Sequence, residues 1–256
     1  MKRLFLLFVI GFLLTGCSKV PENTVYSIDD LEGKKIGVQL ETTGDAYATD
    51  IKDAQVKRFN KAQDAVHALS AGEIDAVILD DGPANVFVGQ HDNLRILEEP
   101  YAREEYGLAV KKGNQELLDK LNEALDNIEE KGILEDIIHG WIYDDATTSV
   151  YEGQAKESYA NGTLIVVTNA EFPPYESVVG EEIVGIDIDI MKAICDELDM
   201  KLEVRNIAFD SIIGALDRGS ADVGATGMTI TEKRLEQVDF TDPYTTATQV
   251  VIVRNE

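Results

Sequence analysis

The sequence predicts an α/β fold of two lobes with a cleft between them. Strand-like and helix-like patterns alternate through the first half of the 256-residue chain, stop at a polar stretch over residues 143–162, and then start again. Segments 65–77 and 212–223 follow one plan, a helix ended by glycine and then a buried strand led by aspartate. Two lobes of similar design place their strand ends around a shared cleft, where α/β proteins bind ligands.

Composition and charge exclude several classes of function. A content of 44% apolar residues is enough for real cores. The formal net charge of −25 argues against nucleic acid and against a basic membrane-binding face, because both need clustered Lys and Arg. Three scattered His and two Cys indicate neither a metal site nor a disulfide framework, and we expect no cofactor.

The N-terminus carries an export signal. Two basic residues precede the apolar run 4–14, which is too short for a stable membrane-spanning helix, so residues 1–16 are assigned to a signal peptide. The run ends in Leu14-Thr15-Gly16-Cys17, which resembles the bacterial lipobox. That resemblance implies a lipid on Cys17, which becomes the first residue after cleavage, and a tether over residues 17–23. A chance Cys after an ordinary signal peptide is the alternative.

Helices and strands are expected in a regular succession. In the first half these are a strand over 34–39, a turn over 41–44, helices over 44–52 and 61–70, a buried strand over 74–79, a strand over 106–111, and helices over 115–130 and 133–141. In the second half they are a strand over 163–168, a loop over 169–176, a helix over 185–200, a strand over 202–206 and a helix over 209–217. The stretch 143–162 between the halves is expected to be a linker. Cys195 lies at helical spacing with apolar residues, which favours a core thiol over a reactive one.

Residues 222–234 form the stretch best suited to bind a ligand. The turn over 224–227 consists of small residues that allow close backbone approach, and Thr229 and Thr231 can cap the helix that follows. Arg234 lies at most one turn into that helix, and its planar guanidinium can make two parallel bonds to a carboxylate. The alternative is a capped helix with a surface Arg.

Asp80 is the second candidate. It ends the buried strand 74–79, and ligands of α/β sheets bind outside the carboxyl ends of strands. A capping role for the helix that starts near Ala84 is the alternative.

Four motifs of the second half resemble the first lobe of the polar amino-acid solute-binding proteins of ABC importers, family 3. They are Asn169 to Glu176, Gly185 to Asp189, Gly227 to Arg234, and Asp239 to Tyr244. Segments in the first half resemble that family's second lobe and C-terminal helices, namely 31–39, 42–44, 75–80, 106–110 and 132–141. The resemblance implies a periplasmic-binding-protein-like type II fold. Because family members normally begin with the segment found here at Thr163, it also implies a circular permutation, with a truncated tandem of two binding proteins as the alternative.

The permuted order sets the expected domains. Residues 24–108 would form lobe B, the family's second lobe, and residues 109–256 would form lobe A, which combines the C-terminal helices, the linker and the family's first lobe. Only residues 106–111 would then link the lobes covalently. The chain ends would meet at the second, cut hinge, which would broaden the range of open forms.

The resemblance implies that nine residues bind a free amino acid. They are Arg234, Thr229, Gly227, Asp80, Phe172, Phe209, Asn169, Thr42 and Thr43. Arg234 would hold the α-carboxylate with help from Thr229 and from Thr42 or Thr43, and Asp80 would take the α-ammonium together with the Gly227 carbonyl. The two phenylalanines would sandwich the side chain, unless they only pack in a core, and Asn169 would reach its polar tip.

Three positions depart from the family's pattern and bear on specificity, namely Glu41, Gly82 and Thr245. The extra acid at Glu41, with Glu171 and Asp81 nearby, favours a cationic side chain such as that of Arg, Lys or His over that of Gln.

The sequence therefore predicts a monomeric, lipid-anchored protein on the extracytoplasmic face of the cell membrane. It would close on a polar amino acid, with cationic ones favoured, and present it to an ABC-transporter permease without catalysing a reaction. One alternative is a cyclic-acid dehydratase of the same fold, for which Glu171 and Glu41 are the candidate acids, with no base partner evident. Another is an extracellular amino-acid sensor, although no membrane-spanning or signalling segment follows Glu256.

Overall fold

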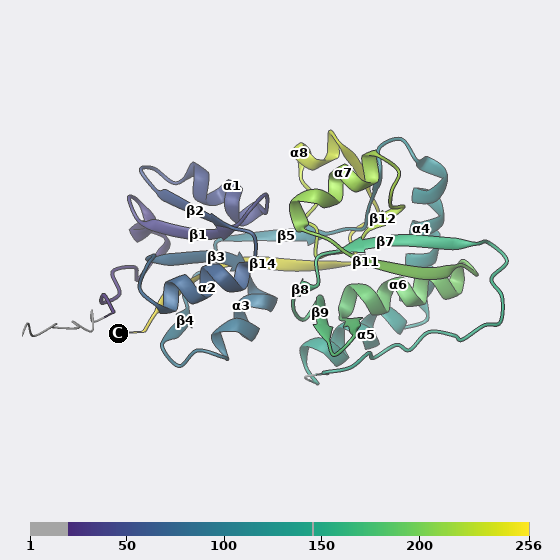
Figure 1. Cartoon of the computed structure of the whole chain (residues 1–256), viewed down its shortest axis with the longest axis horizontal. Helices are drawn as coiled ribbons and strands as arrows, with labels where there is room; N and C mark the ends of the chain where they lie inside the picture. The colour runs from purple at the N-terminus through teal and green to yellow at the C-terminus, as the bar shows by residue number, and fades with distance from the viewer. Residues whose placement is uncertain (1–19, 145, 256) are drawn as a thin grey trace, which may run out of the picture.

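The computed structural model describes residues 20–144 and 146–255, so the expected signal peptide and Cys17 lie outside the described residues. Figure 1 shows two lobes side by side along the long axis of the molecule, joined by strands that run from one to the other. Within the described residues, no helix combines the length and the apolar character needed to cross a membrane.

The first lobe is built around a six-stranded mixed sheet with strand order β2-β1-β3-β14-β4, in which β5 also pairs with β14. Its elements are a 3-10 turn (Ile28–Leu31), β1 (Lys35–Gln39), α1 (Thr43–Asp50), β2 (Gln55–Phe59), α2 (Ala62–Ser70), β3 (Ala76–Asp80), α3 (Asp81–Val88), β4 (Leu94–Ile96), β5 (Ala102–Tyr106) and β14 (Thr245–Arg254). Strands β1, β2 and β3 are parallel, whereas β14 runs antiparallel to β3. The lobe is therefore completed by the last strand in the sequence.

Strand β14 corrects the expected domain boundary. Residues 109–256 were expected to lie together in the other lobe, but β14 pairs with β3, β4 and β5 of the first lobe. The physical reason is the apolar run 250–253, whose side chains are all buried, because a strand covered on both faces belongs in the middle of a sheet.

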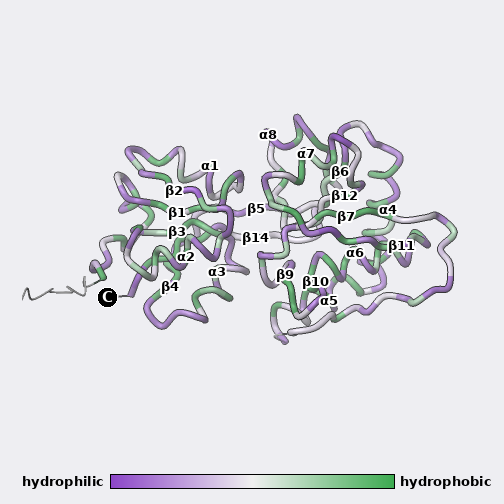
Figure 2. The backbone as a smooth tube through the Cα atoms, in the orientation of Figure 1, coloured by the Kyte–Doolittle hydropathy of each residue, from purple (hydrophilic) through white to green (hydrophobic). Residues whose placement is uncertain are grey.

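The second lobe is built around a five-stranded mixed sheet with strand order β11-β7-β12-β6-β13, beside a small sheet of β10, β9 and β8. Its elements are β6 (Ala109–Lys111), α4 (Gln115–Glu130), α5 (Ile133–Ile142), β7 (Thr163–Thr168), β8 (Glu171–Phe172), β9 (Glu176–Val179), β10 (Glu182–Val184), α6 (Ile186–Glu197), β11 (Lys201–Asn206), a 3-10 turn (Phe209–Ser211), α7 (Ile212–Asp217), β12 (Val223–Gly224), α8 (Glu232–Leu235) and β13 (Val238–Phe240). Figure 2 shows hydrophobic residues along the inner strands of both lobes. One buried cluster lies in the first lobe, one in the second, and a third contains residues of both.

Two segments cross between the lobes, where one was expected. The first leads from β5 to β6 through Gly107 and Leu108, so residues 106–111 are two strands and not one. The second leads from β13 to β14 through residues 241–244. The crossings are bonded to each other, since Leu108 N donates to Thr241 Oγ1 at 3.0 Å and Tyr244 N donates to Tyr106 O at 3.0 Å. The expectation of a looser, singly linked hinge is therefore wrong.

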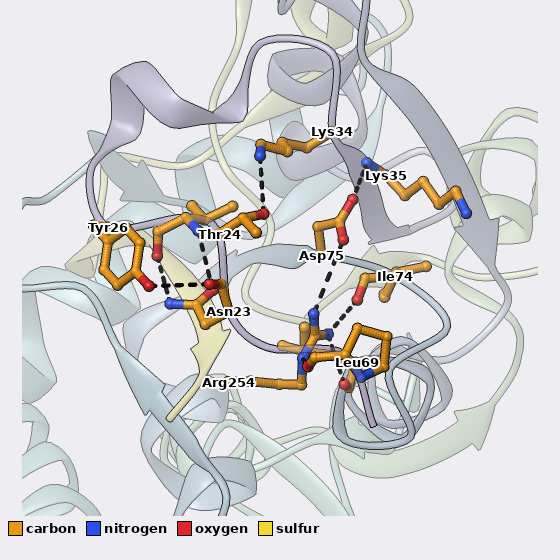
Figure 3. A network of polar contacts seen from close by, with 11 residues as sticks. Asn23, Thr24, Tyr26, Lys34, Lys35, Leu69, Ile74, Asp75 and Arg254 are labelled. Atoms are coloured by element: carbon orange, nitrogen blue, oxygen red, sulfur yellow. Dashed lines mark hydrogen bonds and ion pairs between the residues drawn. The ribbon is translucent and has the colours of Figure 1, made fainter. Parts of the chain in front are cut away.

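The two ends of the described chain meet at the far end of the first lobe. Arg254, at the end of β14, donates from Nε to the carbonyl of Pro21 at 3.1 Å. Its guanidinium also donates to the carbonyls of Leu69 and Ile74, as Figure 3 shows. Val25 and Val253 belong to one buried cluster. The N-terminal residues are therefore fixed against the C-terminal strand within one lobe and not at a hinge.

The stretch expected to be a linker follows the outer side of the second lobe without forming a helix or strand in its described residues (Figure 1). It is nevertheless tied to α6. The buried carboxylate of Asp189 accepts hydrogen bonds from the backbone N–H groups of Val150 and Tyr151, at 2.7 and 3.2 Å, and from the Trp141 indole at 2.9 Å. On the same helix, Cys195 is 3% exposed and burial raises its thiol pKa to about 12, as expected of a core thiol.

Candidate functional site

All nine residues predicted to bind the ligand line one small pocket between the lobes. Gln39 and Thr226, which were not predicted, complete its lining. Four of the eleven lining residues come from the first lobe and seven from the second, and most of them are buried. A larger groove that includes Glu41, Thr42 and Arg234 forms the mouth of the cleft on the side of α1 and α8. The lobes are in contact around the pocket, so this is a closed form.

Arg234 lies in the pocket as a buried cation without a carboxylate partner. Its side chain is held by two carbonyls, that of Thr229 at 2.8 Å from Nη1 and that of Glu41, across the cleft, at 3.3 Å from Nη2. The guanidinium carbon lies 5.4 Å from the centre of the Phe209 ring. Within the described residues it forms no ion pair. Burial lowers the pKa of Arg234, and nearby acids, Glu104 first among them, counteract this. The guanidinium can therefore receive an anion from a ligand.

Asp80 lies at the carboxyl end of β3, as predicted, and is 6% exposed. It occupies the N-cap position of α3, but its side chain makes no capping hydrogen bond. Instead, Oδ1 accepts a bond from the Tyr106 hydroxyl at 2.5 Å. Burial, followed by the charge of Glu104, raises the pKa of Asp80 to about 7. The carboxylate is thus directed to the pocket, where a cationic group would restore its ordinary ionisation.

The turn at Gly227 forms part of the pocket wall that the second lobe contributes. Gly227 has φ of +50°, and a Cβ added there would lie 2.7 Å from the Phe172 ring, so only glycine fits without strain. Its N–H donates to Asp187 Oδ2 at 2.7 Å, and Thr226 donates to Glu176 Oε1 at 2.6 Å. Burial raises the pKa of both acids, that of Glu176 well above its usual range. Buried acids behind the turn therefore hold its backbone in place.

Glu104 is a site residue that the sequence analysis did not identify. It lies on the inward face of β5, two residues before the buried Tyr106, and is 6% exposed. Its Oε2 accepts from three donors: the hydroxyl of Thr43 at 3.1 Å, the hydroxyl of Thr229 at 2.8 Å, and Gln249 Nε2 at 3.1 Å. Its Oε1 is buried without a hydrogen-bond partner in the described part of the chain. The five residues of β5, Ala-Arg-Glu-Glu-Tyr, show no apolar alternation, so no sequence signal marked Glu104 as inward-facing.

The remaining predicted residues form the other walls. Phe172 is buried and Phe209 partly buried, and both line the pocket. Asn169 accepts a bond from Gln39 Nε2 across the cleft at 3.0 Å and donates to the carbonyl of Ile207 at 3.1 Å. Thr42 caps α1, because its Oγ1 accepts from Asp45 N at 3.3 Å.

The acids expected to favour a cationic side chain lie outside the inner pocket. Glu41 lines the mouth of the cleft. Glu171 pairs with Lys61 of the opposite lobe at 2.5 Å. Asp81 accepts from the backbone N–H of Thr248 at 3.3 Å. Gly82 faces the second lobe, and a Cβ added there would lie 3.0 Å from the Tyr175 ring. Glu41 and Glu171 contact the opposite lobe and Asp81 bonds within the first, so any charge selection in the inner pocket depends on other groups.

Part of the chain is similar to a known protein family. Residues 164–256 match the model of the bacterial extracellular solute-binding proteins, family 3. The match covers the Gly227 turn, Arg234 and both phenylalanines, and it also covers β14, which completes the first lobe's sheet.

Individual relatives of family 3 agree. The "Probable histidine-binding protein" of Neisseria gonorrhoeae is 42% identical over 34% of this chain and 33% of its own length. The arginine-binding extracellular protein ArtP of Bacillus subtilis is 37% identical over 36% of each chain, and the L-cystine-binding protein TcyJ of Escherichia coli is 31% identical over 49% of this chain and 48% of its own. A solved ancestral arginine-binding protein bound to arginine is 50% identical over 33% of this chain and 38% of its own, with a TM-score of 0.33.

The chain thus spans about a third to a half of the length of the curated relatives it matches. These homologues are solute-binding proteins and not enzymes, in agreement with the expected absence of a catalytic role.

Proposed function

We propose that the protein binds an amino acid between its lobes and delivers it to an ABC importer. The observation that carries this is the presence, in one pocket, of two buried ionisable groups that form no ion pair within the described residues: Arg234 from the second lobe and Asp80 from the first. An α-carboxylate on the guanidinium and an α-ammonium on Asp80 would place opposite charges at both ends of a zwitterion. The names of the family relatives, which include an ABC transporter arginine-binding protein of Escherichia coli, support delivery to such a transporter.

Within this class, a cationic amino acid is the proposed ligand. Histidine and arginine are the ligands in the names of two of the relatives. In the structure, three acids are buried around the pocket, namely Asp80, Glu104 and Asp187, with one cation, Arg234, among the described residues. Glu176, whose pKa burial raises well above its usual range, adds no charge at neutral pH. A ligand that brings positive charge offsets this excess.

The decisive experiment is native mass spectrometry of protein purified without denaturation, followed by calorimetry with the amino acid that is found. A bound, unchanged amino acid at one per chain is the expected result. A chain that neither retains nor binds any free amino acid would contradict the proposal. Turnover of an added cyclic acid would instead indicate the dehydratase alternative.

A circular permutation is the proposed origin of the order of the lobes. The segment that resembles the start of a family member follows the segment that resembles its end, and in the structure Arg254 contacts Pro21. A rearranged gene that joins residue 254 to residue 23 and opens the chain within 146–162 should fold and bind as before. Both the natural chain and the rearranged chain should be monomers that bind one ligand. A truncated tandem would depend on a missing partner lobe, so it would not form such a monomer.

Anchoring by a lipid on Cys17 is proposed from the resemblance to the lipobox. The carbonyl of Pro21 accepts a hydrogen bond from Arg254 of the first lobe, so a lipid at position 17 would hold this lobe close to the membrane. Substitution Cys17→Ala should release the protein from the membrane fraction without changing ligand affinity. Continued membrane association of this variant would contradict the proposed lipid anchor and would leave the proposed ligand binding unaffected.

A further inference from the structure

Glu104 combines features that a purely structural residue would not need. It is a buried acid on a crossing strand, and one of its two carboxylate oxygens has no hydrogen-bond partner within the described residues. Gln249 Oε1, in the adjacent strand, is a second buried acceptor without a donor. Leaving buried acceptors unpaired costs stability, so glutamate at 104 is a poor choice for the fold itself.

The hydrogen bonds of Glu104 determine what the pocket offers to a ligand. A threonine hydroxyl has one hydrogen to donate, and both Thr43 and Thr229 donate theirs to Glu104 Oε2. Both threonines also line the pocket. Only hydroxyl lone pairs then remain for a ligand, and lone pairs accept from N–H groups and do not help to hold a carboxylate. This differs from the helper role that the family resemblance implied for the two threonines.

The charge of Glu104 reaches the pocket as well. The charge of Glu104 affects both ionisable groups of the inner pocket. After burial, it is the largest contribution to the raised pKa of Asp80, and among the nearby acids it contributes most to keeping Arg234 charged. A ligand ammonium beside Asp80 would favour the ionised form of that carboxyl, and the formal charges of Asp80, Glu104 and Arg234 would then sum to −1. A neutral zwitterion leaves that charge in place, whereas a ligand of net charge +1 cancels it.

We propose that Glu104 is a specificity-determining residue, which holds a second negative charge behind the pocket wall so that only a cationic amino acid neutralises the closed site. The inference rests on the proposed function and adds the residue that selects within it. Glu104 acts through Thr43 and Thr229 and through its charge, and it is therefore a positioning residue and not a direct ligand contact.

The test compares L-arginine with L-citrulline, its near-isosteric neutral analogue, by calorimetry on the wild type and on Glu104→Gln. We expect the wild type to prefer arginine. In Glu104→Gln, arginine should lose about 10- to 100-fold in affinity, while citrulline should keep its affinity or gain, because charge is removed and the hydroxyl hydrogens are freed. The matched control is Glu105→Gln, one residue along β5 and exposed, which should leave both affinities unchanged.

The melting temperature of the ligand-free Glu104→Gln protein separates selectivity from structural support. It should not fall, since an amide introduces a donor where buried acceptors lack one. An equal loss for both ligands, or an unchanged ratio of the two affinities, would overturn the role of Glu104. If the variant does not fold, the wild type alone decides, because equal binding of citrulline and arginine would refute charge selection. A wild type that binds no amino acid would instead refute the proposed function.

Discussion

The two lobes build opposite walls of one pocket from groups of opposite charge. The first lobe supplies the carboxyl groups of Asp80, at the end of β3, and Glu104, on β5, and none of its described residues is a buried cation at the pocket. The second lobe supplies the guanidinium of Arg234, the Gly227 turn and both aromatic rings. Neither wall alone offers a group for each charge of a zwitterion, so we expect the proposed binding to be coupled to closure of the lobes. A ligand with charges at both ends would link the walls.

Removing the cation of the second lobe should have the largest effect. Arg234→Ala deletes the proposed partner of the ligand carboxylate in a closed, largely desolvated pocket. Loss of one member of such a pair costs about 2–5 kcal/mol, or roughly thirty- to several-thousandfold in affinity. Calorimetry against the bound amino acid measures this, with the exposed Arg205→Ala on β11 as control. Binding of Arg234→Ala within about threefold of wild type would remove Arg234 from the site.

Removing the charge of Asp80, in the first lobe, should weaken ligand binding less than removing Arg234 does. Asp80→Asn keeps the shape and an acceptor for the Tyr106 hydroxyl, but removes the charge opposite the ligand ammonium. A hydrogen bond to a charged group contributes about 1.5–3 kcal/mol, so the expected loss is roughly 10- to 150-fold. The melting temperature without ligand should not fall, because a buried charge is removed, and the exposed Asp50→Asn serves as control. Unchanged affinity would show that the Asp80 carboxylate does not contribute to ligand binding.

The pH dependence of the two walls should separate stability from binding. Asp80 has a pKa of about 7 in the folded protein against an ordinary value of 3.8, so the folded state holds the extra proton between these values. Stability of the ligand-free protein should therefore fall as pH rises from about 4 to about 7 and then level off, while affinity for an ammonium rises over the upper part of that range.

Melting temperature and calorimetry across this range measure both trends. Asp80→Asn should flatten the affinity profile and should remove Asp80's share of the stability trend. Glu176 and Asp187 add to that trend with the same sign, because burial raises their pKa values too. Parallel pH profiles of the wild type and Asp80→Asn would contradict the assignment.

The ion pair between Lys61 and Glu171, at the rim of the cleft, should have the smallest effect on ligand affinity. Lys61 and Glu171 join the lobes at 2.5 Å, but their side chains are 52% and 30% exposed, and solvent screens such pairs. Lys61→Ala should change affinity by about threefold or less, with Lys120→Ala, in a surface pair on α4, as control. A loss comparable to that of Asp80→Asn would mean that the rim, and not the pocket, controls closure.

Local chemistry made much of this site predictable from the sequence. Arg234 follows a small-residue turn and Asp80 ends a buried strand, and both signals lie within a few residues of the group itself. Glu104 depends on partners at positions 43, 229 and 249, which only the folded chain brings together. Its strand, Ala102 to Tyr106, has no apolar alternation that would distinguish Glu104 from its neighbours.

The strand β14 was missed for a related reason. Its apolar run is visible in the sequence, but its partner strands are far away in the chain, and its position after the second lobe suggested that it belonged there. Pairing across such distances is decided by which sheet lacks a central strand, and sequence order does not show this.

The position of β14 also sets an order of events during synthesis. It fills the middle of the first lobe's sheet, between β3 and β4, yet it follows the entire second lobe in the sequence. While the chain is being made, the edge of β3 remains open and the faces that β14 will cover stay exposed. The second lobe has all its strands before β14 is complete. We therefore expect the half of the protein that is made first to be the half that folds last.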